Sequence, residues 1–123
     1  MVEELLLDAS SLIYALKPRR LDMLRGNHVQ WLTIYEALNG FWKEASLVKS
    51  ISAEKAVALA GVFGKVLGHM SILSPYGLEE EILRTVLEHG VTVYDASYIA
   101  IVLVRKNGLI LVAGIKKAKK QSS

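Results

Sequence analysis

The chain has 123 residues and no cysteine, which predicts a single domain and excludes disulfide bonds and thiolate metal sites. Hydrophobic residues make up 52% of it, and this high share predicts apolar surface that another chain covers, as in a homodimer. The formal net charge is only +3, but no acidic residue follows Asp95, so the C-terminal end is strongly basic.

No stretch of the sequence predicts a membrane span, because the longest nearly uncharged run, residues 89–104, contains Asp95 and is too short. A secretory signal is not expected, since Glu3 and Glu4 precede the first apolar stretch, where such signals carry lysine or arginine. Together with the absence of cysteine, these features predict a cytoplasmic protein.

The first predicted element is a short strand at residues 5–7, where three consecutive leucines precede Asp8. An unbroken apolar run predicts a strand buried on both faces, because a half-exposed strand alternates apolar and polar residues. A carboxylate at the end of such a strand costs several kcal/mol unless hydrogen bonds or a metal ion satisfy it. Two explanations are open here: Asp8, Ser10 or Ser11 caps a following helix, or Asp8 binds a metal.

Helices are predicted next along the chain. Residues 11–16 form a short helix that Pro18 helps to end, and residues 19–25 form a short basic helix or loop before a glycine and an asparagine. Residues 28–48 carry apolar side chains three to four positions apart, which predicts a first long helix with a wide apolar stripe.

The side chains of the predicted helix 28–48 suggest two surfaces. Trp31, Phe41 and Trp42 belong to the apolar stripe, which either joins the core or forms a partner or dimer face. Glu36 and Asn39 are three residues apart and therefore share a face beside this stripe, where a polar site could lie.

A further helix is predicted over residues 53–67, with Ser52 as its N-cap. Gly61, Gly64 and Gly68 lie within or at the end of it. Since each glycine costs a helix about 1 kcal/mol relative to alanine, their spacing predicts that another helix or strand approaches closely there.

The C-terminal half continues the alternation of strands and helices. A second buried strand at residues 70–73 precedes an amphipathic helix at 78–89, and residues 91–94 lead into a helix at 96–104 before a last buried strand at 109–113. This order predicts an α/β fold, a three-layer α/β/α sandwich with a central parallel sheet. In such folds ligands bind beyond the carboxyl ends of the strands, and Asp8 occupies one of these ends.

Three acidic residues lie in strongly apolar surroundings: Asp8, Glu36 and Asp95. Asp8 and Asp95 both begin the sequence Asp-Ala-Ser before an apolar run, so either both cap helices or both serve a site. Two carboxylates about 4 Å apart repel by roughly 4 kcal/mol at an effective dielectric of 20, so three in one pocket hold protons or bind a cation. Oxygen ligands alone predict magnesium or manganese, which suits phosphodiester cleavage.

The segments LLLDASSLI at 5–13, TIYEALNGF at 33–41 and VTVYDASYIAI at 91–101, followed by NGLILV at 107–112, cover much of the chain. In order and spacing this pattern resembles PIN-domain proteins, especially the VapC-like ribonuclease toxins of toxin–antitoxin pairs. The resemblance implies a magnesium- or manganese-dependent endoribonuclease that hydrolyses single-stranded RNA, dimerises, and is inhibited by an antitoxin covering the acidic pocket.

By motif match, the resemblance implies that Asp8, Glu36 and Asp95 are metal ligands and catalytic acids. Asn39, the neighbour of Glu36, and Ser10, the neighbour of Asp8, would give polar support.

One departure from the family concerns the end of the last strand, where a threonine or serine and then an aspartate are usual. This chain has Ala113 and Ile115 at those positions, which removes one negative charge and one candidate ligand. The alternative prediction is therefore a catalytically weakened or inactive PIN module that binds RNA or a protein partner.

The C-terminal residues suggest the domain organisation. We expect a PIN-like domain over residues 1–115 and a basic tail over 116–123. The tail is either a solvated segment or an RNA-binding one that contacts phosphates through Lys116, Lys117, Lys119 and Lys120.

Overall fold

The computed structural model describes residues 4–16, 22, 24–105 and 109–112. In this part of the chain, one parallel sheet has the strand order β3-β2-β1-β4. Its strands are β1 (Glu4–Leu7), β2 (His28–Gln30), β3 (Ser71–Leu73) and β4 (Leu109–Val112). The helices are α1 (Ala9–Ala15), α2 (Trp31–Lys43) with a π-helical end η2 (Glu44–Val48), α3 (Ala53–Leu67), α4 (Glu79–His89) and α5 (Val93–Arg105).

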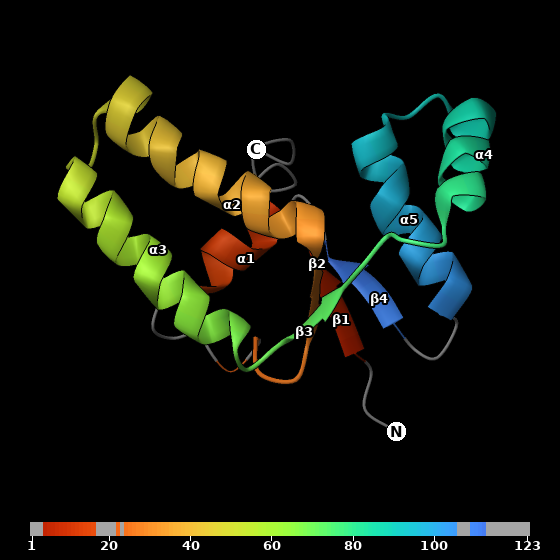
Figure 1. Cartoon of the computed structure of the whole chain (residues 1–123), viewed down its shortest axis with the longest axis horizontal. Coiled ribbons are helices and arrows are strands. Elements are labelled where there is room, and N and C mark those ends of the chain that lie inside the picture. Colours follow the sequence, from red (N-terminus) through yellow and green to blue (C-terminus); the bar gives the residue numbers. More distant parts are fainter. Residues whose placement is uncertain (1–3, 17–21, 23, 106–108, 113–123) are drawn as a thin grey trace, which may run out of the picture.

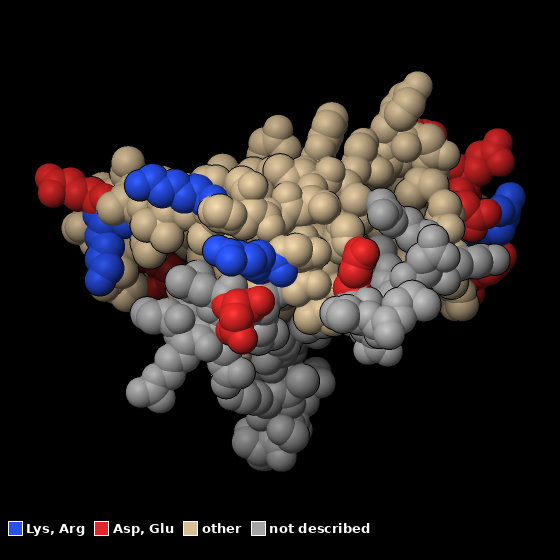
Figure 2. Space-filling view, turned by 90° about the horizontal axis from the view of Figure 1, so that it is seen from below, with Lys and Arg blue, Asp and Glu red and all other residues tan. Residues whose placement is uncertain are grey.

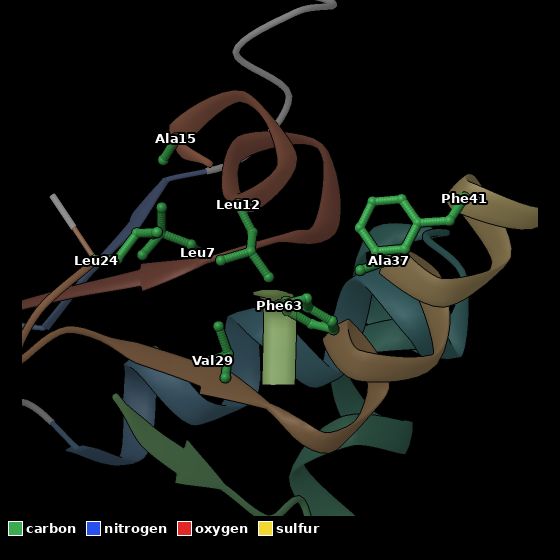
Figure 3. Close-up of a cluster of buried hydrophobic side chains, with 8 residues drawn as sticks. All are labelled: Leu7, Leu12, Ala15, Leu24, Val29, Ala37, Phe41 and Phe63. Carbon is green, nitrogen blue, oxygen red and sulfur yellow. The ribbon is translucent and has the colours of Figure 1, made fainter. Parts of the chain in front are cut away.

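The two faces of the sheet carry separate parts of the core, because consecutive residues of a strand point to opposite faces. Leu7 packs with residues of α1, α2 and α3 in the cluster drawn in Figure 3. Leu6 packs on the other side with Tyr98 and Ile101 of α5. Figure 1 shows α1, α2 and α3 on one side of the sheet, with α4 and α5 on the other. The predicted three-layer α/β/α sandwich with a parallel sheet is therefore confirmed.

Strand β2 corrects the prediction of a helix over residues 28–48. Residues 28–30 are fully inside the sheet between β1 and β3, and all three are buried. Helix α2 begins only at Trp31, because Gln30 has an extended backbone (φ −108°, ψ 170°) and its N–H donates to Thr33 Oγ1. At the other end, residues 44–48 are π-helical and Lys49 is left-handed, with φ 61°.

The other predicted elements lie within a few residues of the observed ones. Helix α1 begins two residues earlier than expected, at Ala9, and Ser52 caps α3 by accepting a hydrogen bond from Lys55 N. Residues 93 and 94 belong to α5 rather than to the segment before it. Strand β3 is not buried as predicted: Ser71 and Ile72 are exposed and Leu73 is half-buried, because β3 lies at the edge of the described sheet. The predicted basic helix or loop at 19–25 falls largely outside the described residues.

No helix or strand among the described residues approaches the glycines of α3 closely, so that prediction is wrong for this part of the chain. A Cβ added at Gly61 or Gly64 would meet none of the described atoms within 4 Å, and at Gly68 it would meet only the Lys65 carbonyl of the same turn, at 3.2 Å. Gly61 and Gly64 are exposed, so they weaken the helix without a packing gain from the part of the chain that the structure describes.

Replacing Gly64 by alanine should therefore raise the free energy of unfolding by roughly 0.5–1 kcal/mol. Urea unfolding followed by circular dichroism measures this change. Gly90→Ala is the matched control and should destabilise, because Gly90 ends α4 in a left-handed conformation, with φ 65°. A loss of stability in Gly64→Ala would contradict the observation that there is space for a Cβ at this position.

Among the described residues, no single helix has the length and apolar character needed to cross a membrane. Helices α4 and α5 satisfy that test only when taken together, and they are bent by 116° relative to one another.

Candidate active site

Asp8 lies where the strand order reverses. The chain runs from β1 outward through β2 to β3, whereas β4 pairs with the other edge of β1. Asp8 follows β1 directly and is half-buried. Its Oδ1 accepts a hydrogen bond from Ser11 N at 2.9 Å, so it is also the N-cap of α1. The capping explanation is thus correct for Asp8, which also lies at the position where parallel sheets bind ligands.

The other two acids come from helices on opposite sides of the sheet. Glu36 is half-buried on α2, and Asp95 is exposed in the first turn of α5. The capping explanation is wrong for Asp95, because Thr92 Oγ1 accepts the hydrogen bond from Asp95 N at 3.1 Å. The side chain of Asp95 is therefore not needed to begin the helix.

The three carboxylates line one cavity of about 280 Å³. We call it the acidic cavity; its lining residues are Asp8, Ala9, Ser10, Glu36, Asp95, Tyr98, Ile99 and Leu111. Among the described residues, no three acidic or histidine side chains converge closely enough to form a preassembled metal cluster. The cavity thus collects negative charge at one place while leaving space between the carboxylates.

Only one of the two residues predicted to give polar support lines the acidic cavity. Ser10 lines the acidic cavity, whereas Asn39 is exposed on α2 and is not one of the described lining residues. The four tail lysines, 116, 117, 119 and 120, lie outside the described residues, as do Ala113 and Ile115.

The three aromatic residues predicted as a core or partner face of α2 differ in burial. Phe41 is buried and its ring meets that of Phe63 edge to face, with 6.0 Å between centroids. Trp31 and Trp42 are 56% and 51% exposed. The core interpretation is therefore right for Phe41, and the two tryptophans remain available to a partner.

Two residues of the site were missed from the sequence. The Tyr98 hydroxyl donates to Glu36 Oε1 at 2.7 Å and also shares a hydrogen bond of 2.8 Å with Thr33 Oγ1. Burial, together with the hydrogen bond to Glu36 and its charge, raises the pKa of Tyr98 well above its usual range, so the phenol stays a donor. Helical spacing places each of them beside a predicted acid, since Tyr98 follows Asp95 by three residues and Thr33 precedes Glu36 by three, but it does not separate Thr33 from Asn39.

A second polar contact joins α5 to strand β2. Gln30 Nε2, at the end of β2, donates to Ser97 Oγ at 2.8 Å, and Ser97 Oγ donates to the Tyr94 carbonyl at 2.6 Å. Gln30 and Ser97 are both buried. These bonds attach the first turn of α5, which carries Asp95, to the central sheet.

Comparison with known proteins finds a curated relative, Exonuclease VapC9 of Pyrobaculum aerophilum, which is 38% identical over 115 residues. The match covers 91% of this chain and 80% of the relative. Among solved structures, the chain is similar to the crystal structure of PAE2754 from Pyrobaculum aerophilum, with a TM-score of 0.70 and 35% sequence identity. That match covers 90% of this chain and 74% of the other. A scan against protein-family profiles gives no match.

Proposed function

Because the chain belongs to the VapC-like family of PIN-fold proteins, we propose that it is a metal-dependent ribonuclease that hydrolyses phosphodiester bonds of single-stranded RNA. The observation that carries this proposal is that Asp8, Glu36 and Asp95 line one cavity at the reversal point of the sheet. The relative's name supports nuclease activity; the metal and the RNA substrate are inferred from the chemistry of the cavity.

The donor set fits magnesium or manganese. The polar groups that line the acidic cavity are carboxylates and hydroxyls, without histidine among the described residues, and such hard oxygen ligands favour these ions over zinc. Asp8, Glu36 and Asp95 would hold the ion. Since magnesium usually keeps several water ligands, the space between the carboxylates is compatible with a hydrated ion.

A bound ion would polarise a phosphate oxygen and lower the pKa of an attacking water. The residues of the chain do the remaining work. Asp8 is fixed by its capping bond to Ser11, and Glu36 is fixed by the phenol of Tyr98. Ala9, Ile99 and Leu111 supply the apolar part of the cavity lining.

Incubation of the purified protein with single-stranded RNA tests the proposal. We expect cleavage with manganese or magnesium and none with a chelator. The named activity of the relative is that of an exonuclease, whereas the family resemblance implies internal cleavage. A circular RNA separates these modes, because only an endonuclease cuts a substrate without ends; we expect it to be cut. Cleavage that persists unchanged in the chelator would contradict the proposal.

The second candidate is a PIN module that binds RNA or a protein without cutting. The absence of a preassembled cluster among the described acids favours it, as does Ile115 at the position of an expected acid. A manganese titration separates the two candidates. Heat release that disappears in Asp95→Asn supports the nuclease, whereas a protein that binds RNA but no manganese supports the module.

We further propose that α2 presents a face to another protein chain, either a second copy or an antitoxin. Trp31, Tyr35, Leu38 and Trp42 follow a four-three-four spacing and are all exposed, so they form one apolar stripe. Figure 2 views the molecule from below, away from the side of Figure 1 on which α2 lies; the upper middle of that other face is free of charged side chains, which gather lower down and at the ends. Mass measurement in solution tests the homodimer.

We also propose that residues 1–115 form the PIN-like domain and that residues 116–123 form a basic RNA-binding tail.

A further inference from the structure

We infer that Tyr98 is a positioning residue that orients the Glu36 carboxylate for metal binding. This inference rests on the proposed function and assigns a role to a side chain that is not itself a ligand. Tyr98 belongs to α5, whereas Glu36 belongs to α2, on the other side of the sheet. The hydrogen bond of 2.7 Å between them therefore helps to join the two helices that line the acidic cavity.

The direction of the hydrogen bonds follows from counting protons. A phenol has one proton, and the Glu36 carboxylate can only accept, so the proton of Tyr98 lies on the bond to Glu36 Oε1. The bond of 2.8 Å between Tyr98 and Thr33 Oγ1 is then donated by Thr33. Its single proton goes to this short bond rather than to the Leu7 carbonyl, the other acceptor, which is 3.5 Å away. Thr33 in turn accepts from the Gln30 N–H at 3.4 Å. The bonds thus run in one direction, from the end of β2 to Glu36.

The ring of Tyr98 is held by its surroundings. Tyr98 is 5% exposed and packs with Leu6 of β1 and Ile101 of α5. The neighbouring bond between Gln30 and Ser97 holds the start of α5 against the sheet. Because both partners of the phenol are buried or half-buried and the ring cannot turn freely, Tyr98 fixes one oxygen of Glu36 in place.

This arrangement has a consequence for metal affinity. A residue that hydrogen-bonds to a metal ligand orients that ligand before the ion arrives, so the ligand loses less conformational freedom on binding. Removing such a residue typically costs about 10–100-fold in metal affinity. Asp95 lies one helical turn before Tyr98. One helix therefore supplies both a candidate ligand and the group that orients the ligand on α2.

A double-mutant cycle with manganese alone as the probe tests the inference. The four proteins are the wild type, Tyr98→Phe, Glu36→Gln, and the double variant. Free manganese is counted by electron paramagnetic resonance, which also reaches weak binding. We expect Tyr98→Phe to weaken manganese binding about 10-fold in the wild-type background and less than about twofold in the Glu36→Gln background.

Equal losses in both backgrounds would overturn the inference, because they would show that Tyr98 acts on the cavity in general rather than through Glu36. No loss in the wild-type background would overturn it as well. Failure of the proposed function looks different: the wild type would bind no manganese, or Asp8→Asn would bind it as tightly.

Tyr76→Phe is the matched control, since this tyrosine is 87% exposed and its removal should leave manganese binding unchanged. Circular dichroism checks that each variant folds. If Tyr98→Phe does not fold, Thr33→Val takes its place in the cycle, because it removes the hydroxyl that holds the phenol. A smaller loss that again depends on Glu36 is then expected, and no loss would overturn the inference.

Discussion

Replacing Asp8 by asparagine should lower the rate of RNA cleavage by about 100-fold or more, since even the groups that support metal ligands contribute about 10–100-fold. Asparagine keeps the shape of the side chain but removes the charge that attracts the ion. The capping bond to Ser11 N should survive, because asparagine caps helices as well as aspartate does. The free energy of unfolding should therefore change by less than about 1 kcal/mol.

Two measurements on the same preparations separate the roles of Asp8. Cleavage of end-labelled RNA in manganese gives the rate, and urea unfolding gives the stability. Glu54→Gln is the control, since Glu54 is an exposed acid in the first turn of α3 and its change should leave the rate as it is. If Asp8→Asn cleaved RNA as fast as the wild type, the activity would come from a contaminant, and Asp8 would only cap α1.

Most elements of the fold could be predicted because each one follows a pattern that is visible in its own residues. The leucines before Asp8, the Ser52 cap of α3 and the amphipathic pattern of α4 are examples. Strand β2 could not, because its His-Val-Gln has only one apolar residue and joins directly onto α2. It is a strand because β1 and β3 pair with it on both sides, and pairing between distant segments is not visible in a local pattern.

The same limit applies to the acidic cavity. The Asp-Ala-Ser repeat and the apolar surroundings of Glu36 were enough to select the three acids that line it. Thr33 and Asn39 both lie three residues from Glu36, so helical spacing treats them alike. Thr33 is buried and touches Tyr98, whereas Asn39 is exposed. Only the position of α2 against the sheet and α5 decides between them.

The glycines of α3 show that a sequence pattern can also predict a contact that the described residues do not make. Their regular spacing resembles that of a packed helix interface, but the described residues leave that face open. What holds α3 instead is Phe63, its one buried residue, which meets Phe41 of α2. An aromatic anchor of this kind cannot be separated in sequence from exposed neighbours such as Val57 and Val62.

Replacing Phe63 by alanine should lower the free energy of unfolding by about 3–5 kcal/mol, the usual cost of deleting a buried phenylalanine ring. The ring is 1% exposed and lies in the cluster that also holds Leu7, Leu12 and Val29 (Figure 3). Its loss leaves a cavity where α1, α2, α3 and the sheet meet. Since small domains are stable by only about 5–15 kcal/mol, this one change should remove a large share of the total.

Urea unfolding at one fixed protein concentration measures the effect, because association with a second copy would add to the apparent stability. The midpoint should fall by about 2 M with little change in slope. Val62→Ala is the matched control: it removes apolar atoms from the next position of α3, but Val62 is 51% exposed, so its midpoint should hardly move. If both variants lost stability equally, the outer face of α3 would be covered by another chain, and the open glycine face next to it would be part of that interface.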